Sequence, residues 1–295
     1  MAQTNFFIFS EEKLNQKIVR PESVLEACEI LESDEDALVY AGGTAIQILR
    51  KQGILSASCF VDISRIASLY QMTKFDSYIR IGPMVSLRSM ETSAEIRELF
   101  PLASAAYSEV ANPRIRNTAT VGGNLSHGDY RLDPPVALLV LGASVEVTSK
   151  DSVRKVALTD FYVDFQQTDI RHGEIVTAVE IPTISIPKSS RFIKMSSLSS
   201  NDWPSASAAA GIFIHDDGKR ILRLGIGALA PTPVSSEIDA TGLSKRELID
   251  AAVASGGKLM DPIPDFRGSS EFKRKLGAVA IEDAVRDAWE GLDHV

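Results

Sequence analysis

The sequence predicts an α+β fold, in which helix-forming and strand-forming stretches are mixed along the whole chain. Three observations lead to this prediction. Stretches with helical spacing alternate with short runs rich in β-branched and aromatic residues. Two Gly-Gly pairs, Gly42-Gly43 and Gly122-Gly123, each come shortly after a β-branched or aromatic residue. Asp217-Gly218 separates two alternating apolar runs, which is typical of a β-hairpin.

In the first third of the chain, helices and strands alternate over short distances. Pro21 suits the first turn of a helix over residues 21–33. The residues expected on its buried face are Val24, Leu25, Cys28 and Leu31. A short buried strand over residues 38–40 leads into the first Gly-Gly pair, and a helix over residues 45–53 ends at Gly53. Further strands are expected within residues 57–64 and 77–83.

The middle of the chain combines helices with strands. Thr92 and Glu95 have the spacing of a capping box, which predicts a helix over residues 92–100. Pro101 should end that helix and start another one. After the second Gly-Gly pair, the apolar stretch over residues 134–143 suits a buried helix. Strands are expected in three stretches after it, residues 144–149, 153–162 and 174–182.

The last third begins at the stretch over residues 182–190, which is the expected boundary between two domains. The hairpin around Asp217-Gly218 follows, and helices are expected at residues 244–256 and 271–290. The residues expected on one stripe of the last helix are Phe272, Leu276, Val279, Val285 and Trp289. The run Gly225 to Ala230 imitates a dinucleotide fingerprint, but prolines follow it where a helix would be required.

Composition and charge limit the class of protein. The length of 295 residues fits two domains, or one large domain with subdomains. The net charge of −8 argues against a large phosphate-neutralising face, so nucleic acid is not an expected partner. No stretch approaches the ~18 apolar residues of a membrane span, and the first residues lack the features of a signal peptide. We therefore expect a cytoplasmic protein without a membrane span.

The cysteines and histidines limit the chemistry of the chain itself. Its two cysteines fit a reducing compartment and are too few for an iron–sulfur cluster, which typically takes about four thiolates. The four histidines show no metal-ligand spacing, and no G-x-S-x-G elbow is present. The sequence therefore predicts no metal site and no catalytic residue on this chain.

The two Gly-Gly pairs are the strongest sign of a ligand. Glycine adopts positive φ and lets a ligand approach the backbone, and successive amides in such a turn form a concave set of donors for phosphate oxygens. Gly42-Gly43 leads directly into a helix, and Gly122-Gly123 is followed by the side-chain amide of Asn124. Two such turns that meet at one place would suit a pyrophosphate. Alternatively, each pair is simply a tight turn after a strand.

The context of these pairs resembles the FAD-binding medium subunit of molybdenum hydroxylases, the flavoprotein family of carbon monoxide dehydrogenase and xanthine dehydrogenase. The first family motif is matched by Ala41, Gly42, Gly43, Thr44, Ala45 and Ile46. The second is matched by Arg116, Asn117, Ala119, Thr120, Val121, Gly122, Gly123 and Asn124. An aspartate before prolines, Asp133, follows as it does in the family. The resemblance extends from about residue 5 to residue 290.

The resemblance implies an FAD-binding fold of the vanillyl-alcohol-oxidase (PCMH) type. Residues 1–182 would form the FAD-binding domain, with subdomains of about 1–57 and 58–182, and residues 183–295 a C-terminal α+β domain. Ala41 to Ile46 and Thr120 to Asn124 would surround the pyrophosphate, and Asp133 would accept hydrogen bonds from flavin hydroxyl groups. Asp133 before two prolines also suits the start of a turn.

Two further positions are implied near the flavin. Lys194 matches a basic residue of the family, and Phe192 matches an aromatic residue close to the ring. A plain strand interior is the alternative for both. The run between Asn124 and Asp133 departs from the small residues common in the family, because it contains His127, Asp129 and Tyr130. These side chains either modify access to the flavin or decorate a loop.

The implied function is electron transfer. FAD would receive electrons from [2Fe-2S] clusters of a small subunit, while a large subunit would carry molybdopterin, and the complex would be a dimer of heterotrimers. An external acceptor would take the electrons. The alternatives are a free-standing FAD-dependent oxidoreductase of the same fold, and a nucleotide-binding protein without redox chemistry. The substrate and the acceptor are not encoded in any motif of this chain.

Overall fold

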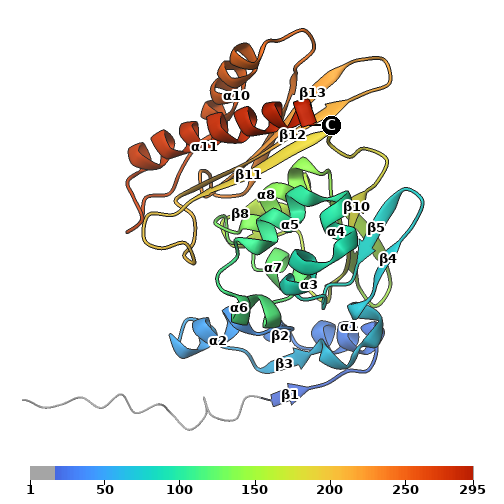
Figure 1. The fold of residues 1–295 in the computed structure, drawn as a ribbon. Coiled ribbons are helices and arrows are strands. Elements are labelled where there is room, and N and C mark those ends of the chain that lie inside the picture. Colours follow the sequence, from blue (N-terminus) through green and yellow to red (C-terminus); the bar gives the residue numbers. More distant parts are fainter. Residues whose placement is uncertain (1–16, 295) are drawn as a thin grey trace, which may run out of the picture.

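A computed structural model describes residues 17–294 of the chain (Figure 1). Expectations for residues 1–16, which belong to the predicted first subdomain, lie outside the described residues. The N-terminal part is a parallel sheet in the order β1 (Lys17–Val19), β3 (Cys59–Asp62) and β2 (Ala37–Tyr40). Helices α1 (Val24–Ser33) and α2 (Thr44–Lys51) provide the connections that parallel strands need.

The predicted helices and strands of this N-terminal part are confirmed, but the buried face of α1 differs at one residue from the prediction. Cys28 and Leu31 of α1 lie in a core with Val61 of β3. Leu25, which was expected on the same buried face, is 52% exposed, and Ala27 is buried instead. Ser23 caps α1 by accepting a hydrogen bond from the Glu26 amide, so the helix begins after Pro21 rather than with it.

The middle of the molecule contains an antiparallel sheet. Its strands, in spatial order, are β4 (Met72–Lys74), β5 (Tyr78–Ile81), β10 (Ile175–Pro182), β6 (Ser144–Thr148) and β7 (Val153–Ala157). The central strand β10 is buried along seven of its eight residues. A strand covered on both faces needs the apolar run that the sequence shows there.

A group of helices packs on this sheet and forms the main core with it. The helices are α3 (Leu87–Thr92), α4 (Ala94–Leu99), α5 (Pro101–Ser108), α6 (Pro113–Thr118), α7 (Val121–Ser126), α8 (Asp133–Val140) and α9 (Leu158–Phe161). Figure 1 shows α3 to α8 in green between the N-terminal and C-terminal sheets. Short elements complete this part: η2 (Ile63–Arg65), η3 (Ala67–Tyr70), β8 (Tyr162–Asp164) and β9 (Gln167–Thr168).

The C-terminal part is a four-stranded antiparallel sheet covered by two helices. Its elements are β11 (Ser189–Met195), β12 (Ala206–Ile214), β13 (Arg220–Gly227), β14 (Val234–Asp239), α10 (Lys245–Leu259), α11 (Ser270–Glu290) and η4 (Gly291–His294). The predicted hairpin is confirmed, because β12 and β13 pair in antiparallel fashion. Gly218 adopts φ of +83° in its turn.

Helix α8 lies against the other side of the C-terminal sheet and joins it to the rest of the molecule. All eight of its residues are buried, as expected for a helix that is covered all round. It contacts β12 and β13. A Cβ atom on Gly225 would lie 2.6 Å from the Val136 carbonyl oxygen, and one on Gly227 would lie 2.5 Å from Val136 Cγ2. The glycines that imitate a dinucleotide fingerprint therefore allow close packing of a helix.

Two predictions in the middle of the chain were wrong in detail. The helix expected over residues 92–100 is two helices, because α3 ends at Thr92 and α4 begins at Ala94. Ser93, rather than Thr92, caps α4 by accepting a hydrogen bond from the Ile96 amide. The strand expected over residues 153–162 ends at Ala157, where the short helix α9 begins.

The buried face of α11 was predicted in part. Val285 is buried, and Leu276 and Trp289 pack against the core as expected. Phe272 and Val279 are 44% and 48% exposed. Small residues, Ala280, Ala284 and Ala288, are buried instead. Helix α11 lies on β12, whose own inner residues are mostly alanine, so small side chains on both surfaces let the helix approach the sheet closely.

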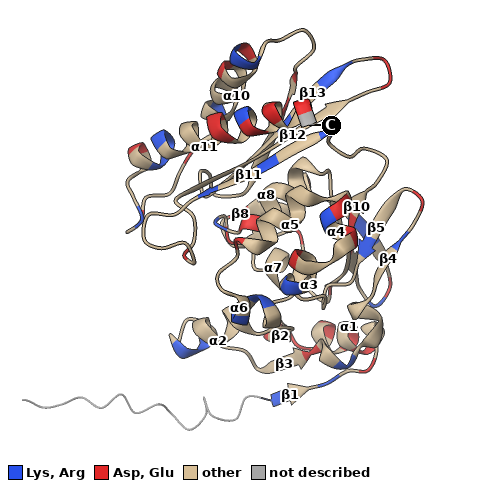
Figure 2. Ribbon diagram, viewed as in Figure 1, with Lys and Arg blue, Asp and Glu red and all other residues tan. Residues whose placement is uncertain are grey.

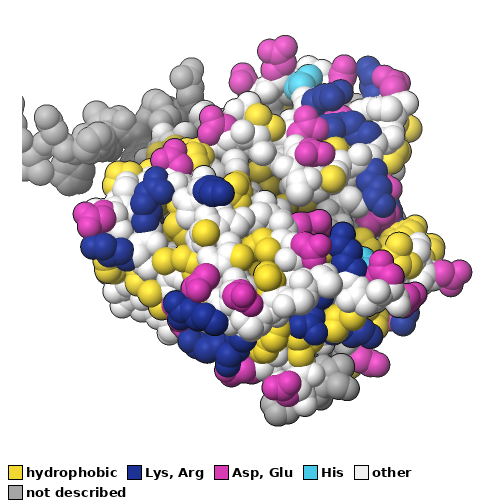
Figure 3. All heavy atoms as spheres, turned by 90° about the horizontal axis from the view of Figure 1, so that it is seen from above, with side chains coloured by type: hydrophobic (Ala, Val, Ile, Leu, Met, Phe, Trp, Pro, Cys, Tyr) yellow, Lys and Arg dark blue, Asp and Glu magenta, His cyan; other side chains and the backbone are white. Residues whose placement is uncertain are grey.

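The charged residues lie mainly on the outer elements (Figure 2). Helices α5 and α7 contain none, which fits their central position. On the face seen in Figure 3, acidic and basic side chains are interspersed with hydrophobic ones, without the continuous positive band that a nucleic-acid backbone would require. In the part of the chain described here, every helix is too short or too polar to cross a membrane.

Candidate functional site

The first glycine motif is the connection from β2 to α2. Gly43 adopts φ of +69° and is the N-cap of α2. A Cβ atom at this position would lie 2.2 Å from the Tyr40 hydroxyl oxygen, so a side chain would have to displace the Tyr40 ring in addition to adopting a strained positive φ. No side chain caps α2, and the first amides of the helix, beginning with Thr44, therefore have no side-chain acceptor. This arrangement leaves backbone donors for a ligand.

The second glycine motif differs from its prediction, because it is the first turn of a helix rather than a glycine turn. Thr120 caps α7, and its hydroxyl accepts a hydrogen bond from the Gly123 amide at 3.2 Å. Among the described residues with positive φ, neither Gly122 nor Gly123 appears. Gly122 is required by packing, since a Cβ atom there would lie 2.3 Å from Pro83 Cβ.

The two motifs meet in the folded chain. A Cβ atom on Gly42 would lie 2.1 Å from the Thr118 carbonyl oxygen and 3.1 Å from Ala119 Cα. A Cβ atom on Gly123 would lie 3.9 Å from the Cβ atom of Ala41. Two segments about 80 residues apart in the sequence are therefore in direct backbone contact. The absence of a side chain at Gly42 serves this contact between the motifs.

Polar groups of the second motif have different environments. The side-chain oxygen Oδ1 of Asn124 is buried and has no hydrogen-bond partner among the described residues. Buried acceptors without a partner are rare in folded proteins, so an additional donor is expected there. Arg116, in contrast, is fully engaged: Nε donates to Glu91 Oε2 at 2.7 Å, and Nη1 donates to the Val110 carbonyl at 2.9 Å. Arg116 stabilises the segment that precedes the motif.

Asp133 and Lys194 form a buried ion pair between α8 and β11. Lys194 Nζ lies 2.9 Å from Asp133 Oδ2, and the side chains are 4% and 5% exposed, respectively. The same ammonium group donates to the Glu109 carbonyl at 2.7 Å. Asp133 Oδ1 has no partner among the described residues. Burial raises the pKa of Asp133 to about 7, against the opposing effect of the Lys194 charge.

The segment Glu109–Ala111 links this ion pair to the second motif. The Glu109 carbonyl accepts from Lys194, and the carbonyls of Val110 and Ala111 accept from Arg116. The structure therefore places Lys194, the partner of Asp133, in contact with the segment that leads to Thr120 and Asn124. Phe192, in contrast, is buried in the main core, in agreement with the strand-interior alternative.

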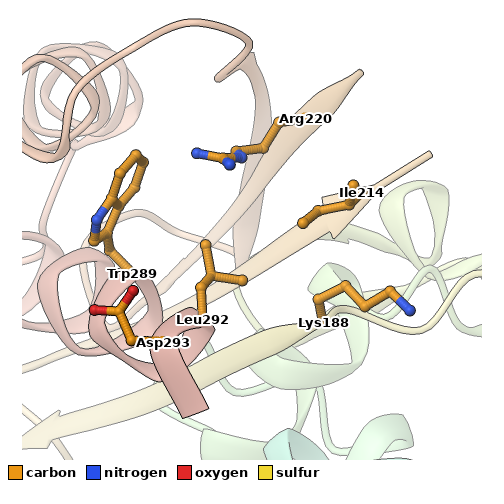
Figure 4. Close-up of a pocket in the computed structure, with 6 residues that line it drawn as sticks. All are labelled: Lys188, Ile214, Arg220, Trp289, Leu292 and Asp293. Carbon is orange, nitrogen blue, oxygen red and sulfur yellow. The ribbon is translucent and has the colours of Figure 1, made fainter. Parts of the chain in front are cut away.

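The surface of the described part of the chain is hollowed at two places of interest. One, of about 310 Å³, is lined by Glu109, Lys194, Ser196, Leu198, Ser199 and Ser200. The other, of about 390 Å³, is lined by Lys188, Ile214, Arg220, Trp289, Leu292 and Asp293 (Figure 4). The larger pocket contains none of the predicted residues. We assign the candidate site to the smaller one, because it contains Lys194 and adjoins the buried Asp133.

Sequence reasoning missed two groups at this pocket. The Glu109 carbonyl is a backbone group, which no residue pattern reveals. Ser196 lies two residues after Lys194, and its buried hydroxyl has no partner among the described residues. Because alternate residues of an extended chain point to the same side, Ser196, which directly follows the end of β11, could have been predicted once Lys194 had been assigned. Within residues 17–294, no cluster of three metal-ligating side chains is present.

Comparison with known proteins identifies the family. A family described as the FAD binding domain in molybdopterin dehydrogenase matches residues 12–184. The chain belongs to this family. The predicted family, the predicted cofactor FAD and the predicted oxidoreductase class are thereby confirmed, and the touching glycine motifs lie within the matched region.

The family relationship extends over nearly the whole chain. The 6-hydroxypseudooxynicotine dehydrogenase complex subunit alpha of Paenarthrobacter nicotinovorans is 31% identical, covering 92% of this chain and 96% of that protein. The carbon monoxide dehydrogenase medium chain of Afipia carboxidovorans is 30% identical, covering 91% and 95%. A solved structure of Cu,Mo-CO dehydrogenase matches with a TM-score of 0.86 at 27% identity, covering 94% and 98%. The α+β FAD-binding fold is thereby confirmed for both the N-terminal and C-terminal parts.

Proposed function

We propose that this chain is the FAD-containing electron-transfer subunit of a multi-subunit molybdenum hydroxylase. It would pass electrons from the [2Fe-2S] clusters of a small subunit to an external acceptor, while a large subunit carries molybdopterin. The direct contact between the two glycine motifs carries this proposal, because it brings the uncapped amides of α2 next to the α7 motif. The relatives named as medium subunits or medium chains support the place of this chain in a larger complex.

The proposed pyrophosphate site combines free backbone donors of the first motif with the Asn124 side chain of the second. The candidate residues are Ala41, Gly42, Gly43, Thr44, Ala45 and Ile46 from the first motif, and Thr120, Gly122, Gly123 and Asn124 from the second. The first amides of α2 lack side-chain acceptors, and phosphate oxygens would satisfy them. The Asn124 side chain can donate through its amide group and accept through its buried Oδ1 atom. In the second motif the amides of Gly122, Gly123 and Asn124 already donate to the Pro83 carbonyl, the Thr120 hydroxyl and the Thr120 carbonyl, respectively. The free donor of that motif is therefore the Asn124 side chain.

Asp133 and Lys194 are proposed to contact the flavin part of the cofactor. The free Oδ1 atom of Asp133 is an acceptor for a hydroxyl group, and the Lys194 charge would favour electron density on a neighbouring ring. FAD would supply the redox chemistry when bound, because a flavin can accept electrons singly or in pairs. The chain contributes binding, orientation and the local electric field.

The proposed FAD site lies where separate parts of the chain meet. We propose residues 1–182 as the FAD-binding domain, with subdomains of about 1–57 and 58–182, and residues 183–295 as the C-terminal domain. Three separate hydrophobic cores in the described residues support a division into three parts, although the N-terminal core extends to Leu69, past the proposed subdomain limit at about residue 57. Residues of the second core come almost entirely from β12 to α11, and those of the third lie mainly before residue 70. The assembly would be a dimer of heterotrimers in the cytoplasm.

The test is to purify the chain together with the products of neighbouring genes. We expect a yellow-brown complex of three different subunits that contains FAD, molybdenum and iron, with the flavin on this chain after the subunits are separated. A chain that turns over an organic substrate alone would favour the free-standing oxidoreductase instead. A preparation of the complex without flavin would overturn the proposal.

A further inference from the structure

The segment between the second glycine motif and α8 carries charged and aromatic residues that the proposed pyrophosphate site does not use. Asp129 is 1% exposed, although it bears a carboxylate. Arg131 holds it with two hydrogen bonds, from Nε at 2.8 Å and from Nη2 at 2.7 Å. The Leu132 amide also donates to the Asp129 carbonyl at 3.1 Å. These bonds fix the backbone of the segment up to the residue before Asp133.

Arg131 also reaches the C-terminal part of the molecule. Its guanidinium carbon lies 4.7 Å from the ring centroid of Trp203, in the loop between β11 and β12, and 5.2 Å from that of Tyr130. A cation within about 6 Å of an aromatic ring centroid is attracted to the ring. Its Nη1 atom lies 3.9 Å from Asp265 Oδ2, in the loop between α10 and α11. One side chain therefore contacts two loops of the C-terminal part.

Those two loops are themselves joined by ion pairs. Arg267 donates to Asp202 at 2.7 and 3.0 Å, and Lys273, which is fully buried, lies 2.9 Å from Asp265. Together with Asp129 and Arg131, the network contains three carboxylates and three cations. Removal of any one of these six side chains should destabilise the protein, because it would leave a mostly buried charge without its partner.

This network lies next to the segments that carry Asp133 and Lys194. Asp133 follows Arg131 by two residues, and its partner Lys194 belongs to β11, which leads into the loop of Asp202 and Trp203. We propose that Arg131 is a positioning residue of the FAD site, which holds Asp133 of the FAD-binding domain against Lys194 of the C-terminal domain. This inference rests on the proposed function, and it adds a residue that lies outside both glycine motifs.

The test compares Arg131→Gln with the wild-type chain, each purified with its partner subunits and then depleted of flavin. Titration of FAD with fluorescence detection should show a dissociation constant about tenfold higher for the variant, which corresponds to ~1.4 kcal/mol. Arg223→Gln is the matched control, because Arg223 is also paired with an acid, Glu237, and stacked on an aromatic ring, Phe213. It should bind FAD like the wild type. An unchanged dissociation constant for Arg131→Gln would overturn the inference.

A double variant distinguishes positioning from a general loss of structure. If Arg131 acts through Asp133, then Arg131→Gln should have little further effect on FAD affinity in the Asp133→Asn background. Equal effects in both backgrounds would contradict that mechanism. If Arg131→Gln does not fold, Arg131→Lys replaces it in the test. This variant keeps the charge without the planar two-point contact, so its FAD affinity should be lower than that of the wild type. A wild-type complex without FAD would refute the proposed function itself, whereas a flavin-containing complex insensitive to Arg131→Gln would refute only this inference.

Discussion

Lys194 Nζ lies 2.9 Å from Asp133 Oδ2, and this buried pair connects the first residue of α8 to strand β11. The sequence suggested both residues separately, through a family resemblance, and gave no indication that they bind each other. The burial of Asp133 has a consequence for stability, because it raises the pKa of this carboxyl to about 7 in spite of the neighbouring lysine. An unfolded aspartate titrates near ~3.9.

Asp133 should therefore make the flavin-free chain less stable as the pH rises. Between about pH 4 and pH 7, the folded chain holds a proton on Asp133 that the unfolded chain has lost, so the contribution to the free energy of unfolding falls by up to ~1.4 kcal/mol per pH unit. Below pH 4 and above pH 7, the contribution is constant. Urea unfolding of the wild type and of Asp133→Asn at several pH values measures it. Parallel profiles for the two proteins would show that Asp133 titrates normally.

Gly42 should tolerate no side chain, because the two glycine motifs touch there. A Cβ atom would lie 2.1 Å from the Thr118 carbonyl oxygen, so Gly42→Ala should push the motifs apart, cost ~1–3 kcal/mol and lower the flavin content. Gly257→Ala is the control, since this exposed glycine of α10 has open space around it. It should stabilise the chain by up to ~1 kcal/mol. Thermal unfolding and flavin content after purification give both results, and equal effects of the two substitutions would refute the contact.

Local patterns predicted most elements of this fold, and tertiary packing decided the rest. Turn and cap signals were sufficient at Gly53 and at Asp217-Gly218, where the backbone conformation depends on neighbouring residues alone. They were only partly sufficient for α11, where Val285 was predicted correctly but three of the buried residues are alanines that fit the close approach of β12. The same limit applies to Gly225 and Gly227, whose function depends on Val136, a residue far away in the sequence.

In the candidate site, too, the sequence revealed the local motifs but not the contacts between distant residues. The residues of the two motifs were recognisable because each motif is a continuous stretch. Their contact through Gly42 and Thr118 was expected only as a consequence of a shared ligand, and the structure shows that it is also direct packing. The network around Arg131 joins residues from three separate segments, and charge patterns along a single sequence do not reveal such a meeting.

Gly122 and Gly123 should respond differently to alanine, although they are neighbours. Gly122 is buried and faces Pro83, where a Cβ atom would lie at 2.3 Å, so Gly122→Ala should cost ~1–3 kcal/mol of stability. Gly123 is exposed, and its Cβ atom would meet the Thr120 hydroxyl at 2.9 Å. Gly123→Ala should cost less than ~1 kcal/mol, the value of a helix cap, and should mainly weaken FAD binding.

Chemical unfolding of both variants without flavin, followed by FAD titration, separates these effects. A large loss of stability in Gly123→Ala, or normal FAD affinity in that variant, would contradict the placement of the cofactor at this motif. Positive φ is not the reason for either effect, since both glycines belong to helix α7 and only packing distinguishes them.

Glu91 provides a final comparison, because it pairs with two arginines that differ in burial. The side chain of Arg116 is 8% exposed and lies 2.7 Å from Glu91, whereas that of Arg88 is 42% exposed and lies 2.5 Å away. Burial opposes ionisation of Glu91, but hydrogen bonds from Arg116 and Arg88 hold its pKa below the usual range. Both pairs look equivalent by distance alone.

Removal of the buried arginine should cost far more than removal of the exposed one. Arg116→Ala leaves the Val110 carbonyl without its donor and Glu91 without its buried partner, and should destabilise the chain by ~3–5 kcal/mol. Arg88→Ala should cost at most ~1 kcal/mol, as is typical of an exposed ion pair. Urea unfolding at pH 7 measures both, and 0.5 M salt should reduce only the smaller effect, since screening acts on exposed charges. Similar losses for the two variants would show that burial does not determine the strength of these pairs.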